Sequence, residues 1–100
     1  MKYIKLVRDK IPEYIKNKGG KPVFRVASAD EYWSGLKEKL REEVEEFIKA
    51  ESIEEIADVW EVIEAVIEYK KFDHQDINTV KLAKAEERGG FKKGIILEEA

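Results

Sequence analysis

Apolar residues recur along most of this chain at intervals of three or four, with short polar or glycine-containing breaks between the periodic stretches. This spacing places the apolar side chains on one face of a helix. In the longest stretch the expected core face consists of Trp33, Leu36, Leu40, Val44 and Phe47. The pattern therefore predicts a mainly helical protein.

Capping residues indicate where each helix begins and ends. Ser28 with Glu31 has the spacing of a capping box, and Ser52 with Glu55 repeats it. The first expected helix runs from near Asp9 to Gly19-Gly20, with Pro12 in its first turn. The second runs from Ser28 to about Ala50, and the third from Ser52 to about Lys71. The fourth begins at Asp73 and Asp76 and ends at Gly89-Gly90.

Two segments outside these helices have β-prone sequences. Residues 22–27 alternate weakly and are β-branched, and the tail of residues 91–97 is apolar at its end. These segments could pair as a minimal β ribbon. We therefore predict an all-α, four-helix bundle-like fold with this ribbon added, in a single domain spanning residues 1–100.

The third predicted helix is apolar on two sides. One stripe contains Ile53, Ile56, Ala57, Trp60, Ile63 and Ile67, and the other contains Val59, Val62, Ala65, Val66 and Tyr69. A helix of this kind is expected to pack against its own core on one side and against another subunit on the other. Both tryptophans are expected to be core residues, and His74 a surface residue in the first turn of the fourth helix.

Composition and charge narrow the class of protein. Charged residues make up 41% of the chain and there is no cysteine, which argues against a membrane protein and against thiolate chemistry. Residues 1–25 carry eight basic and two acidic side chains, whereas residues 38–68 carry three basic and twelve acidic side chains. An acidic middle does not suit a nucleic-acid binder. The charged amino terminus does not resemble a signal peptide, so a cytoplasmic location is expected.

The acidic residues that lie off the solvent side of the predicted helices are the main functional signal. Glu55 and Asp58 fall on the second apolar side of the third helix, where an unpaired carboxylate would cost several kcal/mol. Glu43 falls only about 60° from the core stripe of its helix, and Glu46 extends the same flank. Glu42 and Glu45 are expected on the far side.

These two acid pairs, on helices joined by a short turn, predict a site for Mg²⁺ or Mn²⁺, which prefer oxygen ligands. Two structural interpretations compete with it. Glu55 could be only the acid of a capping box, and Glu43 and Glu46 could be a solvated flank paired with Lys39 and Lys49.

At these residues the sequence resembles the all-α NTP pyrophosphohydrolases, the MazG-like superfamily, and in particular its small phosphoribosyl-ATP pyrophosphohydrolase-like branch. Glu42-Glu43-Val-Glu45-Glu46 and Glu55-Ile-Ala-Asp58 stand where that family has its two acidic motifs. Lys5-Leu-Val-Arg-Asp-Lys-Ile-Pro12 and Lys84-Ala-Glu-Glu-Arg-Gly-Gly-Phe91 resemble its flanking blocks. Only eight residues separate Glu46 from Glu55, a shorter connection than in many members.

The resemblance implies a MazG-type fold, a homodimer or homotetramer, and Mg²⁺-dependent cleavage of a nucleoside triphosphate to a monophosphate and pyrophosphate, as in nucleotide-pool house-cleaning. We expect Glu43, Glu46, Glu55 and Asp58 to be the metal-binding and catalytic residues, with a metal-activated water as the nucleophile. The expected phosphate-binding cations are Lys5, Arg8, Lys10, Lys81, Lys84 and Arg88, with Lys92 as a further candidate.

Base recognition would fall to Trp33 or Tyr32. Two other functions stay open at this point. One is a true phosphoribosyl-ATP pyrophosphohydrolase of histidine synthesis. The other is a non-enzymatic helical module that dimerises through the third helix.

Overall fold

A computed structural model describes residues 4–100, and this part of the chain contains four α-helices and no strand. The helices are α1 (Ile11–Asn17), α2 (Ala29–Ala50), α3 (Ile53–Lys70) and α4 (His74–Arg88). The all-α class is thus confirmed, and each expected helix is present within about two residues of its expected bounds. Each of the four is too short or too polar to cross a membrane.

Local capping explains these bounds. The Ser28 hydroxyl accepts a hydrogen bond from the Glu31 amide while the Glu31 carboxylate accepts one from the Ser28 amide, which completes a capping box. Asp73 caps α4 by accepting from the amides of Gln75 and Asp76. Gly89 ends α4 at φ 82°, a backbone conformation that glycine adopts more readily than other residues.

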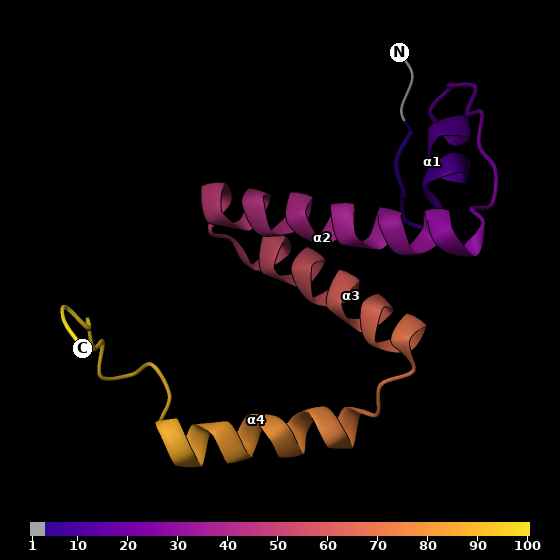
Figure 1. Ribbon diagram of the computed structural model, residues 1–100. Helices are drawn as coiled ribbons and strands as arrows, with labels where there is room; N and C mark the ends of the chain where they lie inside the picture. Colours follow the sequence, from indigo (N-terminus) through magenta and orange to yellow (C-terminus); the bar gives the residue numbers. More distant parts are fainter. Residues whose placement is uncertain (1–3) are drawn as a thin grey trace.

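The core lies between α2 and α3, which form an antiparallel hairpin (Figure 1). Leu36 of α2 and Val59 and Val62 of α3 are its buried side chains. Val44 was also expected on this face, but it is 38% exposed. Trp60 is 62% exposed, so the expectation that both tryptophans are buried in the core is wrong.

The segment before α1 lies against α2. A Cβ added at Gly35 would come within 3.0 Å of the Leu6 Cβ, so a residue without a side chain allows the two backbones to approach closely. Farther along, Arg25 pairs with Glu31, and this pairing together with the Ser28 amide lowers the pKa of Glu31 to about 2. These contacts hold the chain that precedes α2 near its N-terminal half.

The predicted β ribbon is wrong for the described residues, in which neither residues 22–27 nor residues 91–97 form a strand. Val23 is fully exposed, and Phe91 and Ile95 are also exposed. The tail leaves from the end of α4, which Figure 1 shows on the other side of α3 from residues 22–27. A two-stranded ribbon without a surface to pack on is only marginally stable in water, so local β propensity is not enough here.

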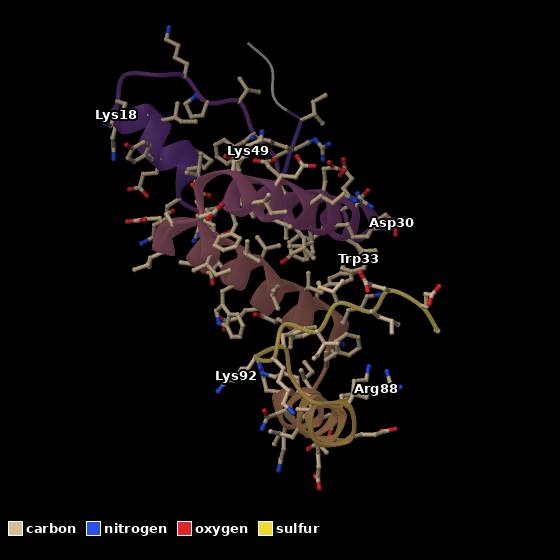
Figure 2. The ribbon with its side chains drawn as sticks, turned by 90° about the vertical axis from the view of Figure 1, so that its left-hand side faces the viewer. Lys18, Asp30, Trp33, Lys49, Arg88 and Lys92 are labelled. Atoms are coloured by element: carbon tan, nitrogen blue, oxygen red, sulfur yellow. The ribbon has the colours of Figure 1, made fainter. Side chains whose placement is uncertain are left out.

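Among the described residues, α2 and α3 make the one extensive helix–helix contact, and α4 stands apart from them (Figures 1 and 2). Ile77 is the α4 residue that is half-buried, and the other α4 residues are exposed. The described chain is therefore a helical hairpin with an outlying fourth helix, rather than four helices around one core.

Candidate functional site

The hairpin brings carboxylates from two helices together. Glu43, Glu55 and Asp58 each offer an oxygen atom, and these atoms lie within 4.8 Å of one another. All three residues are half-buried, as their positions near the apolar stripes predicted. We call them the acidic triad. Three carboxylates from two helices are a donor set that suits Mg²⁺ or Mn²⁺ better than a soft metal.

The capping interpretation of Glu55 accounts for its amide but not for its carboxylate. The Glu55 amide donates to the Ser52 hydroxyl at 3.2 Å. In the described part of the chain, however, the reciprocal bond from the Ser52 amide to the Glu55 carboxylate is not formed, unlike that at Ser28. The Glu55 carboxylate is thus directed to the triad rather than used to complete a capping box.

Glu46 differs from the residues of the triad. Glu46 is exposed, so the expectation that it lies off the solvent side of its helix is wrong. Its charge nevertheless acts on the triad. Partial burial, followed by the negative charges of Asp58, Glu46 and Glu43, raises the pKa of Glu55. Glu46 therefore lies near the triad without belonging to it.

The raised pKa of Glu55 gives a testable pH dependence. The folded chain binds a proton at Glu55 more tightly than the unfolded chain does, so ionisation of this group destabilises the fold as pH rises through the ordinary glutamate range to the raised pKa. We expect Glu55→Gln, without divalent cations, to gain melting temperature relative to wild type over that interval and to keep the gain at neutral pH. Thermal melts across pH would measure it.

Glu45→Gln, an exposed change on α2, is the control for this measurement. Loss of a favourable helix-dipole interaction at Glu55 would give the opposite pH trend, because that interaction requires the ionised form. A variant that loses stability relative to wild type as pH rises would therefore contradict the proposed crowding of negative charge.

Arg8 is the predicted phosphate-binding residue that contacts the triad. Its Nη2 donates to the Asp58 Oδ1 at 2.8 Å, and its Nη1 lies 3.6 Å from the Glu61 Oε1. Sequence reasoning missed this pairing, because the partners are 50 residues apart and no local spacing signals the contact. The Arg8 guanidinium is about half exposed, so one side of it can meet an anion from solvent.

Lys5 lies in a second charge cluster on α2. Its Nζ is 3.4 Å from the Glu42 Oε1, which also lies 3.4 Å from the Nζ of Lys39. Partial burial acts to raise the pKa of Glu42, but the charges of Lys39 and Lys5 outweigh it and leave that pKa lowered. Glu42 was expected on the far side of its helix, and it is half-buried because the segment before α1 covers this side of α2.

Lys39 also pairs with Glu43 at 3.4 Å, as the solvated-flank interpretation proposed, although Glu43 is not solvated: its side chain is only 13% exposed. Lys39 is likewise largely buried, at 19%. A lysine this close partly offsets the negative charge of the triad. The triad is therefore compensated by Lys39 and Arg8 together.

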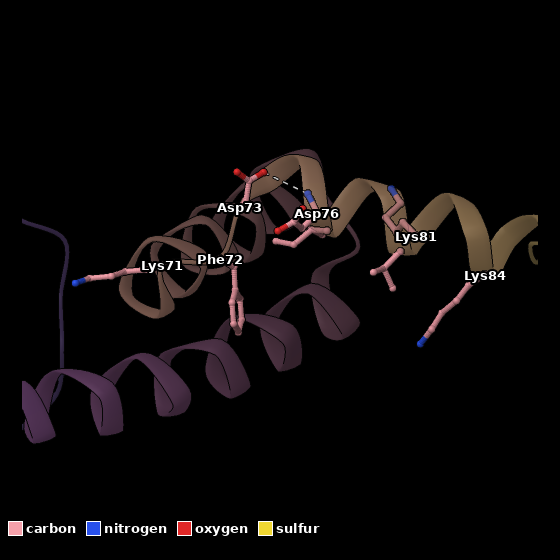
Figure 3. Close-up of a pocket in the computed structure, with 8 residues that line it drawn as sticks. Lys71, Phe72, Asp73, Asp76, Lys81 and Lys84 are labelled. Atoms are coloured by element: carbon pink, nitrogen blue, oxygen red, sulfur yellow. Dashed lines mark hydrogen bonds between the residues drawn. The ribbon is translucent and has the colours of Figure 1, made fainter.

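The predicted cations of α4 and of the tail that follows it lie away from the triad. Lys10 is exposed at the start of α1. Lys81 and Lys84 line an open hollow of about 580 Å³ beside the α3–α4 turn (Figure 3). Arg88 is the last residue of α4 and Lys92 follows it in the tail, and both lie far from Lys49 at the end of α2 (Figure 2). Within one chain these α4 cations and the triad do not form one site.

The aromatic candidates for base recognition form a cluster at the other end of the hairpin. The Trp33 ring stacks on Tyr69, with centroids 5.3 Å apart and planes 8° apart, and Tyr32 contacts the same tyrosine. The Nζ of Lys70 lies 4.4 Å from the centroid of Trp33. Trp33 precedes Glu43 by ten residues, or about 15 Å along the helix. His74 is exposed at the start of α4, as expected.

Comparisons with known proteins neither identify a family nor supply a function. No family model matches the chain, and no solved structure matches it. An uncharacterised protein of Mycolicibacterium smegmatis is 53% identical over 47 residues, which are 47% of this chain and 48% of that protein. The match thus spans about half the length of the curated relative.

Proposed function

We propose that this protein is a Mg²⁺-dependent nucleoside triphosphate pyrophosphohydrolase with a MazG-type active site. The acidic triad is the observation that carries the proposal. Glu43, Glu55 and Asp58 come from two helices, their oxygens lie within 4.8 Å, and capping does not account for the Glu55 carboxylate. The resemblance of the flanking sequence blocks supports the choice of substrate class.

In this proposal the triad, with Glu46 at its edge, holds Mg²⁺ (or Mn²⁺) against the phosphates. The cation would neutralise phosphate charge and make water more acidic. The oxygen of the attacking water forms a bond to the α phosphorus. The bond from that phosphorus to the oxygen that bridges the α and β phosphates breaks, and pyrophosphate leaves with the bonding electrons. A carboxylate of the site that is not bound to the cation would accept the proton that the attacking water releases.

Arg8 has the best position among the predicted cations to bind the substrate. Its contact with Asp58 places a planar guanidinium at the rim of the triad, where it can bind two phosphate oxygens at once. A triphosphate that approaches the triad from solvent would meet Arg8 first. Neither a nucleic-acid polymer nor a membrane is part of this proposal.

A non-enzymatic helical module is the second candidate function, and the exposed apolar side of α3 favours it. Ile53 and Trp60 are exposed in the single chain. In such a module Arg8 and Lys39 would simply neutralise the triad as structural ion pairs. A phosphoribosyl-ATP pyrophosphohydrolase would use the same triad and differs only in substrate.

A pyrophosphate-release screen over ordinary and modified nucleoside triphosphates and phosphoribosyl-ATP, with Mg²⁺ present, tests the proposal. We expect turnover of at least one nucleoside triphosphate, together with a rise in melting temperature when Mg²⁺ is added, because a ligand that binds the folded state stabilises it. The melts should be repeated with EDTA as the control.

The outcomes separate the three candidates. If phosphoribosyl-ATP is the one substrate that is cleaved, the protein is a phosphoribosyl-ATP pyrophosphohydrolase, and the proposed metal site is unchanged. No turnover of any substrate, with no stabilisation by Mg²⁺ or Mn²⁺, would contradict both enzymatic candidates and leave the helical module.

A further inference from the structure

Two of the cations that contact the acidic triad, Arg8 and Lys39, differ in how firmly they are held. Lys39 and its partner Glu43 are largely buried and both belong to α2, so the helix fixes their pairing. The side chains of Arg8 and Asp58 are 54% and 39% exposed. Ion pairs in contact with solvent are screened and contribute little to stability. Arg8 is therefore the counter-ion that a competing ligand can displace.

The backbone of Arg8 is anchored, whereas its side chain can turn. The Arg8 carbonyl accepts a hydrogen bond at 3.1 Å from the Ile11 amide, at the start of α1. Leu6, two residues earlier, lies against Gly35 of α2. From this anchored point the side chain reaches α3 through single bonds that have several staggered rotamers. The guanidinium can thus change partners while the segment before α1 stays in place.

One edge of the guanidinium is occupied by carboxylates of α3. Its Nη2 donates to the Asp58 Oδ1 at 2.8 Å, and its Nη1 lies 3.6 Å from the Glu61 Oε1. A phosphate group that binds two guanidinium nitrogens at once needs such an edge. A divalent cation on the triad also needs the carboxylate of Asp58, and it repels a positive group beside it. Cation and phosphate would therefore both favour the release of Arg8 from Asp58.

We propose that Arg8 is an exchangeable counter-ion, which occupies Asp58 in the free chain and turns to the phosphates of the substrate when a divalent cation binds the triad. The exchange rests on the proposed function, because it takes the triad as the metal site, and it gives that site a form of regulation. The coupling is reciprocal: a cation that frees Arg8 raises the affinity for phosphate, and phosphate raises the affinity for the cation by the same factor.

The charge balance of the site supports this exchange. When its members are ionised, the triad carries three negative charges, which Lys39 and Arg8 reduce to a net charge of −1. A divalent cation would change this to +1 if Arg8 stayed on Asp58. With Arg8 on a phosphate, the triad, the cation and Lys39 are together neutral. Transfer of the arginine thus removes an excess positive charge from the site and places it on the negative substrate.

Arg8→Gln tests the exchange through metal binding alone, without turnover. Titration of the full chain with Mn²⁺, followed by the electron paramagnetic resonance of the free ion, gives the dissociation constant. We expect Arg8→Gln to bind Mn²⁺ about fivefold more tightly than wild type, because the cation no longer competes with a guanidinium for Asp58. If Arg8 instead orients Asp58 for the metal, its loss would weaken binding. The sign of the change therefore separates the two roles.

Two further variants control for charge and for shape. Lys21→Gln removes one positive charge from an exposed position outside the helices, and we expect it to change the Mn²⁺ affinity less than about twofold, because solvent screens that charge. Arg8→Lys keeps the charge but loses the planar fork, so its Mn²⁺ affinity should stay near that of wild type. Circular dichroism should show that every variant is helical.

The phosphate half of the exchange is tested with inorganic pyrophosphate at saturating Mg²⁺, by isothermal titration calorimetry. We expect Arg8→Gln to bind this probe about tenfold more weakly than wild type, because a charge-assisted contact to phosphate is lost. Arg8→Lys should fall between the two. Tighter binding of the metal together with weaker binding of pyrophosphate is a result that a purely structural ion pair would not give.

Three results would overturn the proposal. Arg8→Gln could bind Mn²⁺ no more tightly than wild type, which would show that Arg8 does not compete with the metal. It could bind pyrophosphate as well as wild type does, which would show that Arg8 does not turn to phosphate. Both of these results leave the proposed hydrolase intact. If neither wild type nor Arg8→Gln binds Mn²⁺, the metal site itself is absent and the proposed function fails as well.

Discussion

Asp58→Asn is expected to reduce pyrophosphate release about a hundredfold or more, since even indirect partners of a metal ligand cost ten- to a hundredfold when removed. Asp58 is half-buried, shares the triad with Glu43 and Glu55, and holds Arg8 at 2.8 Å. The amide preserves the shape of the side chain but removes the negative charge that a divalent cation requires. Steady-state turnover and the Mg²⁺-induced shift in melting temperature should fall together.

Glu61→Gln is the matched control for this variant. Glu61 lies on the same helix and contacts the same arginine, at 3.6 Å, but it is not part of the triad. We expect it to keep most of the activity and the full response to Mg²⁺. Equal losses in the two variants would mean that the arginine pairing, rather than a metal centre, accounts for the effect. An Asp58→Asn protein as active as wild type would contradict the proposed catalytic site.

Leu36→Ala is expected to be the most destabilising single change in the hairpin. Leu36 is 3% exposed and shares the small core with Val59 and Val62. Truncation of a buried leucine costs about 2 to 5 kcal/mol. Because domains of this kind are stable by only about 5 to 15 kcal/mol, the variant should be partly unfolded at moderate temperature. Urea titration followed by circular dichroism would measure the loss.

Ile48→Ala provides the comparison on the same helix. Ile48 is 64% exposed and lies outside the α2–α3 core, so we expect its substitution to change the free energy of unfolding by about 0.5 kcal/mol or less. Both titrations should be made at the same protein concentration, so that the two midpoints can be compared directly. Similar midpoints for the two variants would show that Leu36 is not the centre of the core.

The helices were predictable from sequence because their determinants are local. Ser28 with Glu31, Ser52 and Asp73 satisfy amides within three residues of themselves, and the structure has each of these caps. The face occupied by a side chain is also largely local, since it follows from about 100° per residue. This rule placed Glu43, Glu55 and Asp58 near the packed side of their helices, where they lie.

The same rule failed where contacts came from elsewhere in the chain. Glu42 was expected on the far side of its helix, but periodicity did not show that the segment that carries Lys5 crosses that side of α2. Trp60 was expected in the core, but α3 packs on α2 through the opposite side. Periodicity shows that a helix has two apolar sides, and it does not show which of them the chain itself covers.

The sequence by itself thus determined four helices, the side-chain caps of α2, α3 and α4, and a pair of acidic positions on each of the two central helices. Only the tertiary structure decided that Glu43, Glu55 and Asp58 meet while Glu46 remains outside, that Arg8 reaches Asp58, and that α4 stands apart. The physical reason is the distance along the chain over which each interaction acts. Caps and helical faces depend on neighbours within one turn, whereas the meeting of distant side chains depends on how whole helices cross and on which surfaces remain to be covered.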